Sequence, residues 1–312
     1  MPLQQHHFPF GPHLDVAARS RVGAGPLMRS ENQDNFLLID ASGTAHFLFE
    51  QQPQTVVVSG WTAGHVRLAV LDGMGGHGHG REAAEAVVAG LLAIPAATDL
   101  DSLAAQLDAL HARLLARFGA DSDPEPRPGT TLTMLDIAPG GPALLYHVGD
   151  SRLYKIAHGK VEVLTVDHVP ATTFAMEGLL GEREWWQQVH AEHRPQISQA
   201  FILGNAFADP LSLSDELFAL TSGKLPPYLA HLPDRRPVPL ESDAVYVLAT
   251  DGFWSCTDPL AQIARWPGLL SRHEGAGAMA DALMAAMDDC PPGFLYPDNL
   301  SAIVIKPRGS EE

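Results

Sequence analysis

Apolar and polar positions recur along this chain with two different periods, and glycine, proline and aspartate separate the segments. Short runs rich in β-branched and aliphatic residues predict β-strands. These runs are residues 35–39, 66–71, 131–137, 143–148, 152–157, 244–249 and 300–306. Apolar residues at helical spacing predict helices over 80–93, 100–118, 259–266 and 275–288.

Two tight connections, at 139–142 and at Gly149-Asp150, predict how the strands pair. Each joins two predicted strands through very few residues, which implies antiparallel pairing. Strands and helices are mixed without the regular alternation of a doubly wound sheet, so we predict an α+β fold. Segments 169–199 and 205–242 follow neither period, and we expect them to be irregular excursions on the surface of one domain.

The composition is that of a globular protein with a sizeable core, because 46% of its 312 residues are hydrophobic and 18% are charged. A formal net charge of −17 argues against nucleic acid or an anionic membrane as the main partner. The sequence shows neither a bilayer-spanning apolar run nor the pattern of a secretory signal, so we expect a cytoplasmic protein. Cys256 and Cys290 make neither a disulfide framework nor a Cys-rich zinc site, and we expect reduced thiols.

The stretch LAVLDGMGGHGHG, residues 68–80, starts as a strand and then breaks into glycines. Residues 73–78 fit the G-x-G-x-x-G pattern of a loop that binds a dinucleotide. That loop requires an acidic residue at the end of a second strand about 20 residues further on, whereas a second predicted helix follows here. Asp72 would also bring negative charge to the phosphates. These facts disfavour a dinucleotide site and leave Asp72 as a candidate metal ligand.

Aspartates recur at the ends of predicted strands. Asp72-Gly73 and Asp251-Gly252 each end an apolar run, and the other positions are Asp34, Asp150 and Asp298. A single aspartate in such a place usually caps a turn. Five of them in one fold favour a site for a hard divalent cation such as Mg²⁺ or Mn²⁺, which prefers oxygen ligands. The glycine after Asp72 would let the Gly73 carbonyl turn inward as a further ligand.

Short motifs then follow one another in a distinctive order. They are RSENQD at 29–34, DGMGG at 72–76, GTT at 129–131, GDSR at 149–152, DH at 167–168, TDG at 250–252 and DN at 298–299. In this order they resemble the type 2C metal-dependent protein phosphatases, the PPM family of serine/threonine phosphatases, and most of all its bacterial members. The resemblance covers about residues 19–306.

The resemblance implies a four-layer α-β-β-α sandwich, in which helices flank two antiparallel sheets. It also implies an organisation into an N-terminal arm (1–18), a single phosphatase domain (19–307) and a tail (308–312). Residues 169–199 would then be a flap near the active site.

The resemblance assigns a metal role to each aspartate. Asp72 would bridge two Mn²⁺ or Mg²⁺ ions, with Gly73 offering its carbonyl. Asp251 and Asp298 would complete the shell of the first ion, and Asp34 would support the second, mostly through water.

A third, weaker ion would be held by Asp150 together with Asp251. Arg29 would bind the substrate phosphate through its planar guanidinium. The implied reaction is hydrolysis of phosphoserine and phosphothreonine by a metal-activated water, without a covalent intermediate.

The implied partners are phosphorylated proteins, the products of serine/threonine kinases in signalling, and we expect a monomer with no nucleic-acid or membrane partner. Two alternatives stay open. The chain could be a pseudophosphatase scaffold that binds phosphoproteins, or a hydrolase of small phosphomonoesters.

Some positions depart from the family pattern. Gln33 stands where many members have glutamate, and Met74 stands where some members have a histidine proposed as general acid. Nearby histidines, His77 and His79, are candidates for that proton transfer, but the favoured interpretation is that they only mark the entrance of the helix. The motifs at 129–131 and 167–168 are expected to be structural, and 205–242 is longer than the usual link to Asp251.

Overall fold

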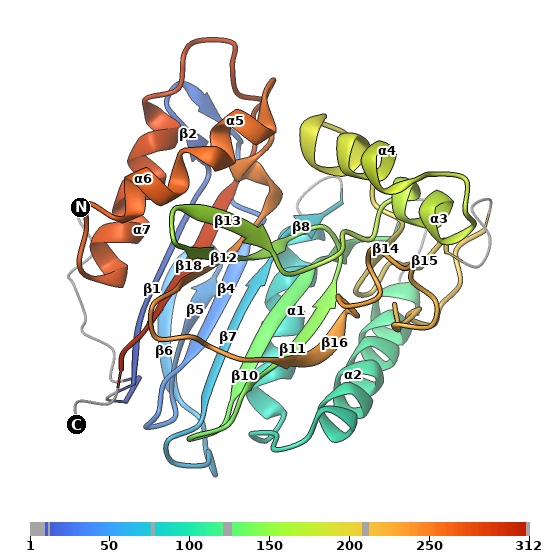
Figure 1. The fold of residues 1–312 in the computed structure, drawn as a ribbon. Helices are drawn as coiled ribbons and strands as arrows, with labels where there is room; N and C mark the ends of the chain where they lie inside the picture. Colours follow the sequence, from blue (N-terminus) through green and yellow to red (C-terminus); the bar gives the residue numbers. More distant parts are fainter. Residues whose placement is uncertain (1–9, 12, 76–78, 121–126, 208–211, 310–312) are drawn as a thin grey trace.

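The computed structural model describes residues 10–11, 13–75, 79–120, 127–207 and 212–309 (Figure 1). Its main body contains two sheets in which every neighbouring pair of strands is antiparallel. The five-stranded sheet has the order β1 (Leu14–Arg21), β18 (Leu300–Pro307), β17 (Val245–Ala249), β12 (Arg152–Ala157), β13 (Lys160–Val163). The seven-stranded sheet has the order β16 (Arg235–Val238), β11 (Ala143–Val148), β10 (Leu132–Ile137), β7 (Val66–Leu71), β4 (Asn35–Ile39), β5 (Thr44–Phe49), β6 (Gln52–Val57).

Helices cover the outer face of each sheet (Figure 1). On the seven-stranded sheet they are α1 (His79–Ala93) and α2 (Leu100–Ala120), and on the five-stranded sheet α5 (Pro259–Ala264), α6 (Trp266–Leu270) and α7 (Ala276–Asp288). The predicted α+β sandwich with antiparallel sheets is therefore confirmed. Short two-residue strands complete the set: β2 (Gly23–Ala24), β3 (Leu27–Met28), β8 (Gly73–Met74), β9 (Gly129–Thr130), β14 (Gln199–Ala200) and β15 (Gly204–Asn205).

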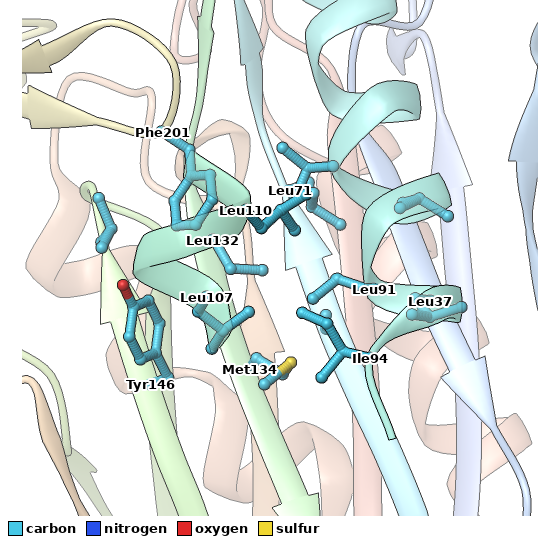
Figure 2. Close-up of a cluster of buried hydrophobic side chains, with 14 of the residues drawn as sticks. Leu37, Leu71, Leu91, Ile94, Leu107, Leu110, Leu132, Met134, Tyr146 and Phe201 are labelled. Carbon is cyan, nitrogen blue, oxygen red and sulfur yellow. The ribbon is translucent and has the colours of Figure 1, made fainter. Parts of the chain in front are cut away.

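Three apolar layers separate the four structural layers. One lies between α1, α2 and the seven-stranded sheet, where Leu91 and Leu107 pack on Met134 (Figure 2). A second lies between the sheets, and a third lies under α6 and α7. Because successive side chains of a strand point to opposite faces, β18 sends Val304 to the helix side and Ile303 to the space between the sheets. This explains why central strands are apolar at nearly every position.

The prediction that Gly149-Asp150 joins two paired strands is wrong. Strands β11 and β12 belong to different sheets, so this connection carries the chain from one sheet to the other. Gly149 has φ +113, and an added Cβ would lie 2.6 Å from the Thr131 side chain, so a larger residue would be strained there. The connection at 139–142, in contrast, does join the antiparallel pair β10 and β11.

The prediction of an irregular segment over 169–199 is also wrong. It contains α3 (Pro170–Met176), α4 (Glu182–Trp186) and a π-helix, Gln187–Ala191. These helices are too short to show a clear period in the sequence. Their apolar side chains pack with residues from the segment 207–229 in a small separate core, in which Trp185 and Leu220 are buried. Apart from Asn205 in β15, the bridge at Ser214 and β16, the described part of 205–242 contains no helix or strand, as expected.

Smaller differences concern element boundaries. The predicted helix 259–266 ends earlier, because α5 stops at Ala264 and a second helix, α6, begins at Trp266 with Pro267 in its first turn, where the missing amide hydrogen is tolerated. Strand β1 lies partly within the predicted N-terminal arm, where Leu14 pairs with Pro307. Strand β6 contains a proline and mostly exposed residues, as edge strands often do. It was not predicted because it contains no apolar run.

Within the described ranges, none of the helices combines the length and the apolar character needed to cross a membrane.

The layer between the two sheets predicts a stability effect. Leu68, which has no exposed surface, packs there, so Leu68→Ala should lower the free energy of unfolding by about 2–5 kcal/mol through lost contacts and a residual cavity. Val57→Ala, at a position that is 77% exposed, is the control and should change little. Urea denaturation of both variants measures the difference, and equal effects would contradict this account of the core.

Candidate active site

Five aspartates lie at one end of the two sheets because of how the strands pair. Strands β4 and β7 are antiparallel neighbours with Asn35 opposite Leu71, so Asp34 and Asp72 meet at the same end. Strands β17 and β18 repeat this arrangement in the other sheet, where the Thr250 amide bonds to the Ser301 carbonyl at 3.0 Å. Asp251 lies just after the end of β17, and Asp298 lies just before the start of β18. Both sheets thus present carboxylates to one shared region.

Asp150 joins the same group through the chain crossing between the sheets. Arg152 is paired with Ala249 in the register of β12 and β17, which brings Asp150 beside Asp251. Burial is the largest cause that raises the pKa of Asp251, and repulsion from Asp298 and Asp150 raises it further. The sequence predicted all five aspartates as one site, and the structure brings all five together.

The electrostatics of this group show that negative charge is concentrated there. Burial is the largest cause that raises the pKa of Asp72 well above its usual value, and the charges of the other four aspartates raise it further. Burial also raises the pKa of Asp34 to about 7 and that of Asp150 to about 7. A bound divalent cation would remove this repulsion and favour the ionised carboxylates. The donor set therefore fits a hard cation with oxygen ligands.

Within the described ranges, no three carboxylate, imidazole or thiolate groups already converge on one point as metal ligands do. The concentrated charge, rather than a closed cage, marks this place. Four of the aspartates keep part of their surface accessible, whereas Asp34 is 3% exposed. Asp34 accepts a hydrogen bond from the Thr250 hydroxyl at 2.8 Å, which joins the strand ends of the two sheets.

Arg29 lies at the rim of this group. Its Nη2 donates to Asp298 Oδ1 at 2.8 Å, and its Nε donates to the Pro297 carbonyl at 3.0 Å. The Arg29 side chain is 49% exposed, so it can also meet a ligand from solvent. Ser255 supports the second oxygen of Asp298 from the loop after β17, at 3.2 Å.

Comparisons with known proteins agree with this arrangement. No protein-family model matches the chain. Over 125 residues it is 35% identical to the serine/threonine protein phosphatase PstP of Mycobacterium tuberculosis, a match that covers 39% of this chain. The chain spans only 24% of that relative's length.

Solved structures match almost the whole chain. The S. agalactiae serine/threonine phosphatase superposes with a TM-score of 0.64 at 20% identity, over 94% of this chain and 99% of that one. The catalytic domain of PstP in complex with two manganese ions superposes with a TM-score of 0.59 at 22% identity, over 95% and 99%. This chain has the fold of the bacterial PPM phosphatases.

Within this PPM fold, Asn299 is a residue whose role the sequence did not reveal. Its Oδ1 accepts from the Gln33 amide at 2.9 Å, and its Nδ2 donates to the carbonyls of Glu31 and Val22 at 3.0 and 3.1 Å. It thereby ties the loop that carries Arg29 to the strand that follows Asp298. Its signals in the sequence were its place directly after Asp298 and its membership of the motif at 298–299, and neither indicated these contacts.

Gly73 is enclosed by backbone on two sides. An added Cβ would lie 2.4 Å from the Gln33 carbonyl oxygen and 2.3 Å from that of Gly80, so no larger residue fits. Thr131, which follows the paired strand β9, donates its amide N–H to the Asp72 carbonyl at 2.9 Å. These contacts account for the glycine and for the structural role expected of 129–131. A metal contact of the Gly73 carbonyl stays a prediction.

The motif Asp167-His168 is held by protein groups, and the charge of Asp167 also contributes, after burial, to the raised pKa of Asp150. Asp167 is ion-paired with buried Arg152 at 2.7 Å, and His168 Nδ1 accepts from Gln199 at 2.8 Å. Of the two histidine candidates for proton transfer, His79 starts α1 with Glu82 at 3.5 Å, and His77 lies outside the described residues.

The crowding of carboxylates generates a prediction about the metal-free protein. Asp251→Asn removes one of the repelling charges at unchanged size, so the melting temperature without metal should stay equal or rise, while the rise produced by Mn²⁺ should shrink. Asp243→Asn, at an exposed position, is the control and should alter neither value. Thermal melts with and without Mn²⁺ decide, and an unchanged Mn²⁺ response in Asp251→Asn would remove this residue from the site.

Proposed function

We propose that this chain is a metal-dependent protein phosphatase that hydrolyses phosphoserine and phosphothreonine. The observation that carries the proposal is the gathering of five aspartates at the shared end of two sheets, beside the half-exposed guanidinium of Arg29. The PPM fold supports it, as does the sequence relative, which is a serine/threonine protein phosphatase.

In this proposal Asp72 would contribute to two Mn²⁺ or Mg²⁺ ions, with the Gly73 carbonyl as a further ligand. Asp251 and Asp298 would complete the shell of the first ion, and Asp34 would support the second, mostly through water. The manganese complex of the PstP catalytic domain supports a pair of ions. Such ions supply two effects when bound, activation of a water near neutral pH and neutralisation of charge on the phosphoryl oxygens. Asp150 with Asp251 would hold a third, weaker ion.

The protein's own residues then have defined tasks. Arg29 binds a phosphoryl oxygen through the guanidinium surface that faces solvent, which suits the planar fork of arginine. Thr250 fixes the orientation of Asp34, and Ser255 fixes that of Asp298. Asn299 keeps the Arg29 loop in place beside them.

A cysteine nucleophile is disfavoured by the surroundings of both thiols. Burial raises the pKa of Cys256 to about 11, and it also raises that of Cys290. A thiol needs a lowered pKa to act as a nucleophile at neutral pH. Direct attack by water is therefore the better account of hydrolysis.

The relative's name supports phosphorylated proteins as the substrate class. A monomeric state, a cytoplasmic location and the lack of a nucleic-acid partner stay predictions from the sequence. The two alternatives differ in measurable ways, since a pseudophosphatase scaffold releases no phosphate, and a small-ester hydrolase prefers a small phosphomonoester to a phosphopeptide.

Metal removal tests the proposed chemistry. The protein stripped with EDTA should release no phosphate from a phosphothreonine peptide, and added Mn²⁺ or Mg²⁺ should restore release, because every proposed ligand is an oxygen atom. Zinc-free buffer with excess chelator is the control for trace metals. Full turnover by the stripped protein would overturn the proposal.

Arg29 provides a second test. Arg29→Ala should lower kcat/KM for the phosphothreonine peptide roughly 10- to 1000-fold, as expected from losing about 1.5–4 kcal/mol of charge-assisted bonding. Arg29→Lys should recover only part of this loss, since an ammonium lacks the two-pronged geometry. Calorimetric Mn²⁺ titration is the control and should be largely unchanged. Wild-type kinetics in Arg29→Ala would leave phosphate binding to the metals alone.

A further inference from the structure

Arg152 is a buried cation that contacts three separate parts of the structure. Its side chain is 3% exposed and belongs to β12, two residues after Asp150. Nε and Nη2 donate to the Asp167 carboxylate at 2.7–3.0 Å. A buried arginine needs a hydrogen-bond partner for each of its donors, so the guanidinium and the groups that accept from it hold one another in place.

The first part that Arg152 holds is the start of the flap, residues 169–199. Asp167 lies just before it, and the Asp167 carbonyl accepts the Thr172 hydroxyl of α3 at 2.7 Å. The same hydroxyl accepts the indole N–H of Trp185 at 3.1 Å, inside the small core of the flap. Contacts therefore run without a gap from Arg152 to the centre of the flap.

The second part is the far end of the flap. Arg152 Nη2 donates to the Val189 carbonyl at 2.8 Å, within the π-helix Gln187–Ala191. Such π-helical turns are rare and are frequent at functional sites. A charged donor at this carbonyl holds the turn against the body of the protein, because hydrogen bonds from charged groups are the stronger ones.

The third part is the loop after Asp251. The Arg152 guanidinium lies 4.4 Å from the centre of the Trp254 ring, and the Trp254 amide donates to the Asp251 carbonyl at 2.9 Å. One side chain thus spans from the flap to a proposed metal ligand. Between these parts lies a cavity of about 90 Å³, lined among others by Asp150, Asp251 and Gln188 of the flap.

We propose that Arg152 is a positioning residue that holds the flap against the Asp251 loop and so fixes the cleft that receives the peptide around the phosphorylated residue. The proposal rests on the proposed phosphatase function. Loss of Arg152 should therefore affect two kinds of substrate differently. A small phosphomonoester needs only the aspartates and Arg29, whereas a peptide must also fit the cleft beside the flap.

The chain offers a matched control in Arg67, which is fully buried at the start of β7. Arg67 also binds an aspartate, Asp136, at 2.8 Å, donates to backbone carbonyls and lies 5.0 Å from a tryptophan ring. It holds the end of α1, where Leu91 and Ile94 supply the carbonyls, at the end of β7 away from Asp72. Arg67→Lys therefore causes the same chemical loss without touching the flap.

The experiment compares Arg152→Lys with Arg67→Lys in kinetics and in amide hydrogen exchange. At saturating Mn²⁺, Arg152→Lys should raise KM for a phosphothreonine peptide about tenfold, which corresponds to one charge-assisted hydrogen bond, and change p-nitrophenyl phosphate hydrolysis by less than about twofold. Exchange should accelerate at 187–191. Arg67→Lys should accelerate exchange near residue 91 and leave the ratio of the two substrates unchanged.

Equal effects of both variants on both substrates, or unchanged exchange at 187–191 in Arg152→Lys, would overturn the proposal. If Arg152→Lys does not fold, Asp167→Asn weakens the same ion pair, and the same changes in KM and in hydrogen exchange are expected of it. If the wild type hydrolyses neither substrate, the proposed function fails and the claim about the peptide fails with it. The exchange result then still decides separately whether Arg152 holds the flap.

Discussion

Asp34, Asp72, Asp150, Asp251 and Asp298 are held close together by strands whose pairing prevents them from separating. Mutual repulsion adds to the cost of burying carboxylates, and both effects raise the pKa values of Asp72 and Asp251. A protein tolerates such an arrangement only where the rest of the structure compensates for it. The rest of this fold can be understood as the support for that charge.

The support comes mainly from apolar packing. Three layers of buried side chains join the four structural layers, and the one between the sheets fixes the distance between the two groups of strand ends. Polar contacts then set the detail. Thr250 bonds to Asp34 across the sheets, and Asn299 connects the loops that carry Arg29 and Asp298. Packing brings the carboxylates together, and these few hydrogen bonds orient them.

Buried arginines serve as connectors at both ends of the sandwich. Arg67 joins the end of α1 to the seven-stranded sheet, whereas Arg152 joins the flap to the loop after Asp251. In each case the guanidinium has a carboxylate, at least one backbone carbonyl and an aromatic ring as partners. The same chemistry thus stabilises a helix end in one place and the edge of the proposed active site in the other.

Most strands of the two main sheets and the long helices that cover them could be predicted. A strand buried on both faces is a continuous apolar run, and a long amphipathic helix shows its period. The aspartates could be predicted as one group from their recurrence at strand ends and from the order of the motifs. The short helices of the flap could not, since elements such as Glu182–Trp186 are too brief to show a period.

What the sequence determined by itself was therefore the set of elements with a strong local pattern and the identity of the acidic residues. The tertiary structure alone decided which strands share a sheet. Gly149-Asp150 reads as a hairpin turn, but it crosses between sheets, because sheet membership depends on packing between distant segments and not on the turn itself. For the same reason the partners of Arg152 were not visible in the sequence, since Asp167, Val189 and Trp254 meet it only in the folded chain.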